Sequence, residues 1–529
     1  MTPARLLRKQ ARSDGASDGA AGSSPRRGSP SSAPPPLPRG FSIDLDVDTK
    51  RLSDGTLFGG SPARAMRLTP AGSRALGELL DGPIRSSGAG TLARRLTDAG
   101  LAHPVPPNTI GPAALSVTVV IPVRDRTAML DRCLAALGDD HAVVVVDDGS
   151  ADPRSIAAVA RQHGAVLCRR DHGGGPAAAR NTGLTGVDTE LVAFLDSDCV
   201  PPAGWLASLA AHLADPLVGA VAPRIVAVRS TAGASAADRY AAACSSLDLG
   251  GRPARVMPGG RVSYVPTAAL LVRRAALAEL AADRDVFDAA LRYGEDVDLI
   301  WRMHGAGWRI RYEPAVEVAH ASPAGWTGLL ARRFRYGSSA GPLARRHPAS
   351  MAPLVLQPWP TAAAGALLAR RPALALAAGV GGWLELTELV RRAGIPADGA
   401  PGATVTAIRQ TWLGIGRYAT QFAAPALAAL LCAPGGTTSA RRWGRRAAVA
   451  SLLLGPALTG YAQRKPDLGP VPFVLAHIAD DVCYGTGVWA GCVQARTLVP
   501  VTPVVSWRPL RLTGGRGPDR TIEKVNADG

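Results

Sequence analysis

The chain has 529 residues, of which 59 are Lys or Arg and 42 are Asp or Glu, so its formal net charge is +17. Hydrophobic residues make up 47% of the sequence and charged residues only 19%, a balance that excludes a chain-wide disordered or histone-like protein. The high Ala, Arg, Gly and Pro content is typical of a GC-rich genome, which adds basic charge without a functional demand, so we expect no nucleic-acid partner.

The N-terminal part of the chain divides into a tail and a small module. Residues 1–40 are rich in Ser, Pro, Gly and Arg and contain no apolar run, which predicts a disordered tail. Residues 41–107 are predicted to form a winged-helix-like module that ends in a proline-rich linker at 104–107. Its expected elements are strands at 41–47 and 56–60 and helices at 70–80 and 91–101.

An α/β pattern begins at Val117. The apolar runs 117–123 and 142–146 predict buried strands, and helical spacing follows each of them, at 129–137 and 155–163. Strands that alternate with helices indicate a parallel sheet with helices on both faces. Ligands of such sheets bind at the carboxyl ends of the strands, so the residues after each apolar run are candidates for the site.

Two motifs follow at these strand ends. Asp147 and Asp148, with the Gly-Ser turn after them, can hydrogen-bond the edge of a base or ribose, although Asp148 could also merely cap the next helix. Residues 173–181 (GGGPAAARN) form a glycine loop that leads into an alanine-lined helix, from which Arg180 can reach a ligand.

A third motif follows the expected strand 191–195. Asp196 and Asp198 are separated by one serine, and such a pair can take a hard divalent cation between one carboxylate and a diphosphate. Mg²⁺ or Mn²⁺ is the expected metal, because both prefer oxygen ligands.

The order of these motifs resembles family 2 glycosyltransferases of the GT-A fold over residues 115–345. This resemblance implies a role for each residue. Asp148 would read the uracil of a UDP-sugar, Arg180 would be the loop arginine at the donor, Asp196 would lie near the ribose and Asp198 would bind the metal.

Residues 291–299 (LRYGEDVDL) open a predicted helix with an acidic first turn, which the helix dipole alone would favour. In the resembled family this position holds the E-D motif, so the resemblance assigns the catalytic base to Asp296. A carboxylate there would take the proton of the acceptor hydroxyl as the new bond forms, and one such displacement inverts the anomeric centre. Glu295 and Asp298 are expected to orient or cap.

Two later features complete the resemblance. His320 follows two expected strands (308–312 and 315–319); a lone histidine is more often structural, but the resemblance makes it a third candidate around the metal, beside Asp198. The RRFRYG segment resembles an R-x-x-R-[WY] variant of the Q-x-x-R-W motif. Arg335 is therefore expected at the diphosphate and Tyr336 at the acceptor sugar.

A narrower resemblance covers most of the chain. The phrases LPRGF, LTPAG, DAGLAHP and RYGEDVDLIW are similar to the glycosyltransferases of the mycofactocin system. That resemblance implies UDP-glucose as donor and a small peptide-derived redox cofactor as acceptor, decorated with β-1,4-linked glucose units. Two alternatives stay open: a membrane glycosyltransferase of polysaccharide or glycolipid synthesis, and a peptide-binding scaffold with a degenerate transferase domain.

The last third of the chain is predicted to be helical over residues 350–510 and to end in a tail at 511–529. It contains four apolar stretches, of which the first and third reach the roughly 20 residues that span a bilayer. The stretches are 351–369, 372–384, 419–440 and 447–462. Arginine clusters flank them, so we expect membrane association, with a soluble helical domain as the alternative. The seven scattered cysteines fit reduced thiols and a catalytic domain on the cytoplasmic face.

Overall fold

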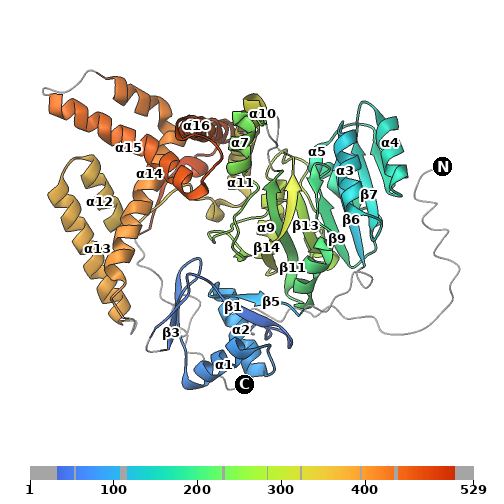
Figure 1. Cartoon of the computed structure of the whole chain (residues 1–529), viewed down its shortest axis with the longest axis horizontal. Coiled ribbons are helices and arrows are strands. Elements are labelled where there is room, and N and C mark those ends of the chain that lie inside the picture. The colour runs from blue at the N-terminus through green and yellow to red at the C-terminus, as the bar shows by residue number, and fades with distance from the viewer. Residues whose placement is uncertain are drawn as a thin grey trace. The chain divides into compact units, whose positions relative to one another are not determined.

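The computed structural model describes residues 33–52, 55–107, 116–228, 233–282, 284–321, 325–392, 396–433 and 439–506. The described residues from 36 onward belong to one compact unit, and Figure 1 labels many of its elements along the chain. The expected C-terminal tail at 511–529 and most of the expected N-terminal tail lie outside the described residues. The boundary of the N-terminal tail is corrected, because Leu37 is buried in the core of the module that follows it.

The N-terminal module contains two helices and two small sheets. Helices α1 (Pro70–Asp81) and α2 (Ser87–Ala99) begin after Thr69 and Ser86, whose side chains cap them by accepting a backbone N–H. β1 (Ser42–Leu45) pairs with β5 (Ala102–Val105), and β2 (Lys50–Arg51), β3 (Thr56–Gly59) and β4 (Arg64–Arg67) form a second sheet. The expected linker at 104–107 therefore begins inside a strand, since Pro104 pairs with Ile43.

A nine-stranded sheet forms the centre of the second part of the chain. Its strand order is β10-β14-β11-β13-β9-β6-β7-β8, and β12 (Ala254–Val256) pairs with β14. The strands β6 (Val117–Val123), β7 (Ala142–Asp148), β8 (Val166–Arg170) and β9 (Leu191–Leu195) are parallel, as expected. The expectation of a wholly parallel sheet was wrong, because β13 (Ala269–Arg273) runs antiparallel to both of its neighbours, β9 and β11 (Val218–Ala227).

Strand β14 (Arg309–His320) unites the two strands expected at 308–312 and 315–319. Its pairing with β11 shifts register between Pro223 and Arg224, so one irregularity replaces the expected break. β14 also pairs with the short β10 (Cys199–Val200), which places His320 opposite Cys199.

Helices cover both faces of the sheet, because successive side chains of its central strands point to opposite sides. Val119 and Ile121 pack with α3 (Thr127–Leu137), α4 (Pro153–Gln162) and α6 (Trp205–Ala210). Val120 packs with α5 (Gly175–Leu184) and α9 (Glu295–Gly305) on the opposite face. This part of the chain therefore has an α/β fold. Helices cover the two faces of the sheet, so the loops at the strand ends are available to form a site.

The C-terminal region consists of long helices: α12 (Pro358–Leu368), α13 (Pro372–Arg392), α14 (Ala400–Cys432), α15 (Ser439–Arg464) and α16 (Pro470–Ala495). α14 is kinked at Ala423, close to Pro425. α16 packs against α10 (Gly325–Ser338) and α11 (Ala340–Arg346), which follow the sheet. α7 (Ala236–Ala243) and α8 (Arg274–Leu280) complete the helices of the middle part of the chain.

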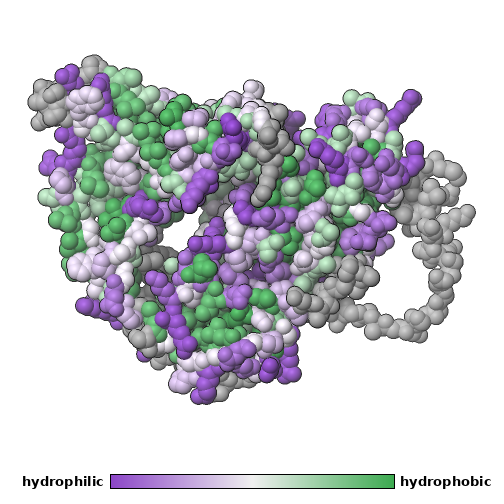
Figure 2. Space-filling view, in the orientation of Figure 1, coloured by the Kyte–Doolittle hydropathy of each residue, from purple (hydrophilic) through white to green (hydrophobic). Residues whose placement is uncertain are grey.

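One helix of the C-terminal region, α13, is long and apolar enough to cross a bilayer, and only 11% of its most apolar window is buried. This corrects the expectation that the first and third apolar stretches, 351–369 and 419–440, are the ones long enough to span a bilayer. The first stretch contains the eleven-residue α12, and the third begins inside α14, around its kink. Figure 2 shows hydrophobic residues on the outside of this region. Leu376 of α13 and Val405 of α14 are among the exposed apolar side chains, with exposed fractions of 70% and 67%.

Candidate active site

A cavity of about 820 Å³ opens at the edge of the sheet where β6, β9 and β14 end. This volume lies in the upper part of the range found for ligand sites. Eight residues expected at the site line the cavity together: Arg180, Asp196, Asp198, Glu295, Asp296, His320, Arg335 and Tyr336. The sequence motifs, spread over more than 150 residues, therefore meet at one place.

The carboxylates after β9 differ in their surroundings. Asp198 is buried and forms an ion pair with Arg126, which follows β6. Its Oδ1 atom has no hydrogen-bond partner among the described residues and lies 3.6 Å from Nε2 of His320. Burial lowers the pKa of His320, which favours the neutral imidazole that binds metals. An unpaired buried carboxylate oxygen facing a neutral imidazole fits a divalent cation between them.

This pair is small for a metal site made by protein alone. The described residues contain no group of three or more His, Cys, Asp or Glu side chains arranged to hold a metal ion. Mg²⁺ and Mn²⁺ in nucleotide sites need only one or two protein ligands, since phosphates and water complete the shell. Asp198 and His320 therefore fit a cation that arrives with a diphosphate.

Arg180 joins the two acidic motifs of the cavity. It lies in α5, is buried, and donates from Nη2 to Oδ1 of Asp196 at 2.7 Å and from Nη1 to Oε1 of Glu295 at 2.9 Å. Its guanidinium also lies 5.6 Å from the centre of the Phe287 ring. These contacts hold Arg180 between the end of β9 and the start of α9.

The start of α9 presents Asp296 to the cavity. Gly294 precedes the helix with φ +82°, a conformation that L side chains rarely adopt, and a Cβ there would lie 2.9 Å from Cδ1 of Leu343. Asp296 accepts the N–H of Val297 through Oδ1, and its Oδ2 has no hydrogen-bond partner in the described part of the chain. Burial, together with the negative charge of Glu295, raises the pKa of Asp296 to about 7.

Asp298 points away from the cavity. It is buried and accepts hydrogen bonds from Nε of Arg302 at 2.7 Å and from Nε2 of His347 at 2.8 Å. These hydrogen bonds tie α9 to the residues that follow α11, and the orienting role expected for Asp298 stays a prediction.

Asp148 does not line the cavity. Its two carboxylate oxygens accept the backbone N–H groups of Gly174 and Gly175 and the Nε–H of Arg170, at 2.7–2.9 Å. Asp148 thus fixes the glycine loop that leads to Arg180, and contact with a uracil base stays a prediction.

The rest of the cavity lining comes from α10 and from residues that the motifs did not include. Arg332, Arg335 and Tyr336 of α10 line it, and so do Tyr264 and Trp301. Further lining residues come from the C-terminal helices: Arg417, Gln421 and Phe422 of α14, and Tyr484 and Val488 of α16. The sequence carried one signal for α16, the pair of aspartates at 480 and 481 inside an otherwise apolar helix.

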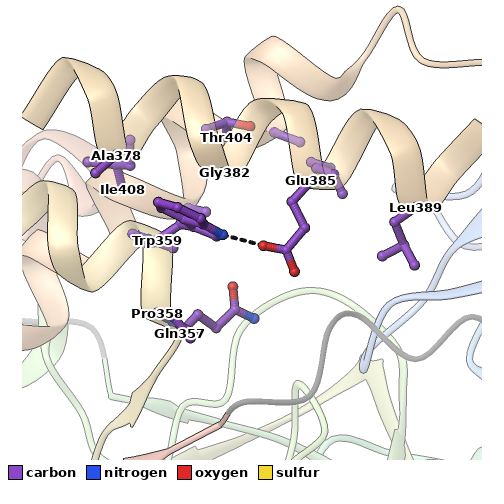
Figure 3. A pocket seen from close by; sticks show the side chains of 13 residues that line it. Gln357, Pro358, Trp359, Ala378, Gly382, Glu385, Leu389, Thr404 and Ile408 are labelled. Carbon is purple, nitrogen blue, oxygen red and sulfur yellow. Dashed lines mark hydrogen bonds between the residues drawn. The ribbon is translucent and has the colours of Figure 1, made fainter.

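A second cavity, of about 150 Å³, lies among α12, α13 and α14. Figure 3 shows Trp359 reaching toward Glu385, whose carboxylate accepts the indole N–H. Glu385 is the acidic residue of this apolar lining and is already engaged. The residues that the motifs singled out line the larger cavity and not this one.

Comparisons with known proteins identify the family of the chain. The sequence profile of the glycosyl transferase family 2 matches residues 118–281. The pre-mycofactocin glycosyltransferase of Mycobacterium tuberculosis is 38% identical over 490 residues, which cover 89% of this chain and 98% of that protein. The glycosyltransferase AglE of Haloferax volcanii is 28% identical over 42% of this chain and 71% of its own length.

Among solved structures, a mannosyltransferase of Pyrobaculum calidifontis in complex with GDP-Man and Mn²⁺ covers 74% of this chain and 89% of its own, with 19% identity and a TM-score of 0.41.

Proposed function

Because the chain belongs to the pre-mycofactocin glycosyltransferase family, within the family 2 glycosyltransferases, we propose that it transfers glucose from UDP-glucose to pre-mycofactocin. Repeated transfer would build a short β-1,4-linked glucan on this peptide-derived redox cofactor. The observation that carries the proposal is the convergence of Asp296, Asp196 and Asp198 in one cavity, joined through Arg180 and Glu295.

Asp296 is the general base of the proposed reaction. It lies at the cavity surface with one carboxylate oxygen unengaged by the described residues, so it can accept the proton of an acceptor hydroxyl. A base with a pKa near the working pH is well matched to this task. The hydroxyl oxygen forms its bond to the anomeric carbon as the bond to the UDP oxygen breaks, so an α-linked donor gives a β-linked product.

The donor side of the cavity is rich in arginine. Arg126, Arg180 and Arg335 line it and can bind the diphosphate, which carries negative charge in the donor and gains more as it leaves. Asp198 and His320 would hold Mg²⁺ or Mn²⁺, which when bound neutralises charge on the departing diphosphate. Asp196 accepts from Arg180 and keeps part of its side chain exposed to the cavity, where it can meet the ribose.

The same proposal places the enzyme at the cytoplasmic face of a membrane. Helix α13 exposes apolar side chains along its length, including Leu374, Leu376 and Leu384. Arginines at its two ends, Arg371 and Arg392, can meet anionic headgroups.

The test of the proposed function is transfer by the purified full-length chain. It would be incubated with pre-mycofactocin, Mn²⁺ and, in separate reactions, UDP-glucose, UDP-galactose and GDP-mannose, and the products weighed by mass spectrometry. Successive additions of one hexose from UDP-glucose are expected. Transfer from GDP-mannose alone would refute the donor assignment, and transfer only to a polyprenyl phosphate acceptor would favour glycolipid synthesis instead.

A further inference from the structure

Helix α16 is in backbone contact with α10, which carries Arg335 and Tyr336, and with α11. A Cβ on Gly337 of α10 would lie 2.1 Å from the carbonyl oxygen of Tyr484, and one on Gly341 of α11 would lie 2.0 Å from that of Gly491. In the opposite direction, a Cβ on Gly487 would lie 2.0 Å from the carbonyl oxygen of Phe334. Only glycine allows the helices to approach so closely, which holds α16 at a fixed place beside α10.

Two buried aspartates of α16 hold it on both sides. Asp480 accepts a hydrogen bond from Nε of Arg333, in α10, at 2.5 Å. Asp481 accepts from Nε2 of Gln421 at 2.8 Å and from Nε of Arg417 at 3.2 Å, both in α14. Each buried carboxylate thus has a charged or polar partner. The residues of α14 and α16 that line the cavity include no carboxylate.

The position of this wall is close to the base. Tyr264 is half-buried and lines the same cavity as Asp296, Tyr484 and Tyr336, and the charges of these three groups each raise its pKa. The donor-side residues come from other elements: Arg126, Asp196, Asp198 and His320 lie at the ends of β6, β9 and β14, Arg180 lies in α5 and Arg335 lies in α10. The C-terminal wall thus shares the cavity with Asp296 and lies on helices that carry none of the donor-side residues.

We infer that α14 and α16 form the acceptor side of the active site, and that Tyr484 is a specificity-determining contact for a sugar-bearing or otherwise ring-containing acceptor. The inference rests on the proposed function and extends it to residues outside the glycosyltransferase motifs. Tyr484 and Phe422 offer aromatic faces for the apolar side of a ring, and the side chains of Gln421 and Arg417 provide N–H donors at the same wall.

The test separates acceptor binding from donor binding in Tyr484→Ala. Three quantities would be measured on the full chain: UDP affinity by calorimetry, slow hydrolysis of UDP-glucose without acceptor, and the KM for pre-mycofactocin. We expect the KM for the acceptor to rise at least tenfold, with UDP affinity and hydrolysis within twofold of the wild type. Tyr484→Phe, which keeps the ring, should restore most of the acceptor affinity.

Tyr461→Ala is the matched control, because Tyr461 lies in α15, outside the cavity, with its ring 5.4 Å from that of Phe473. An unchanged acceptor KM in Tyr484→Ala would overturn the inference, and so would an equal loss of donor and acceptor binding. If the wild-type chain hydrolyses UDP-glucose but leaves pre-mycofactocin unmodified, the proposed function fails. In that case, binding of p-nitrophenyl β-glucoside to the wild-type chain and to Tyr484→Ala would be compared. Weaker binding by Tyr484→Ala would support the inference, and equal binding would overturn it.

Discussion

Arg180 and Glu295 are 115 residues apart in the chain, yet Nη1 of one lies 2.9 Å from Oε1 of the other, and both side chains are buried. Because Arg180 also bonds Asp196, one guanidinium fixes the turn that carries Asp296 relative to the carboxylates after β9. Arg180 of α5 thus connects the start of α9 to the end of β9. This connection sets the distance between the proposed base, Asp296, and the proposed donor site.

Asp296→Asn should leave UDP binding intact and reduce transfer by about 10²- to 10⁴-fold, because the amide keeps the shape of the side chain but cannot accept a proton. Single-turnover transfer and UDP calorimetry measure the two effects. Asp298→Asn is the control in the same helix. It weakens charged hydrogen bonds to Arg302 and His347, so it should lower stability by about 1 to 3 kcal/mol without a matching loss of the chemical step. Near-normal transfer by Asp296→Asn would exclude it as the base.

The rate of transfer should depend on pH through Asp296. Its pKa is raised to about 7, so the carboxyl is protonated and inactive as a base below that pH. The rate is therefore expected to rise as the pH increases from 6 to 8 and then to level off. Single-turnover rates across this range would show it, and Asp296→Asn should flatten the rise. A full rate at pH 5.5 would contradict the assignment.

Removal of divalent metal should abolish transfer, and Mn²⁺ or Mg²⁺ should restore it. Asp198→Ala and His320→Ala are each expected to raise the Mn²⁺ concentration needed for half-maximal rate by tenfold or more, since they remove the two protein groups at the candidate site. His212→Ala is a matched control, because that buried histidine pairs with Glu313, outside the cavity. Undiminished turnover in EDTA would contradict the assignment of a metal to Asp198 and His320.

The contact between α14 and α16 should tolerate no side chain at Gly485, where a Cβ would lie 1.7 Å from the carbonyl oxygen of Gln421. Gly485→Ala is expected to lower the free energy of unfolding by about 3 kcal/mol, at the upper end of typical overpacking costs. Gly365→Ala in α12 meets nothing within 4 Å and should stabilise the chain by about 0.5 to 1 kcal/mol. Thermal denaturation of both variants compares them directly.

Membrane association should depend on the exposed apolar side of α13. The full chain is expected to float with vesicles containing anionic lipid, and a triple change of Leu374, Leu376 and Leu384 to Ser should release most of it. Changing Arg371 and Arg392 to Gln would instead leave apolar binding and remove the dependence on anionic lipid. Failure of the wild-type chain to float at low salt would refute the proposal.

The sequence predicted the parts of the site that come from short motifs after strands. Apolar runs identified β6, β7 and β9, and the residues after β9 were therefore found at the right edge of the sheet. Asp148 shows the limit of this reasoning. The backbone N–H groups of Gly174 and Gly175 bond to its carboxylate oxygens, which a nucleotide base would also need, and the spacing of residues in the sequence does not reveal these bonds.

Other features depended on contacts between distant segments. The antiparallel direction of β13 has no local signal, since a buried apolar strand reads alike in both directions. The role of α16 was missed for a similar reason: its glycines become informative only when the helix they face is known. Tyr264 and Tyr484 belong to no motif, and only the folded chain brings them to Asp296.

The close packing of Gly337 against α16 has a consequence for how the enzyme loses its structure. The cavity walls extend to Pro500, so the segment that matches the glycosyltransferase profile does not build the active site alone. Melting of α16 would remove Asp480, the ion-pair partner of Arg333, and strip one side from the active site in the same event. Loss of activity and unfolding of the C-terminal helices should then coincide in a single cooperative transition, and a chain cut after residue 345 should lose both at once.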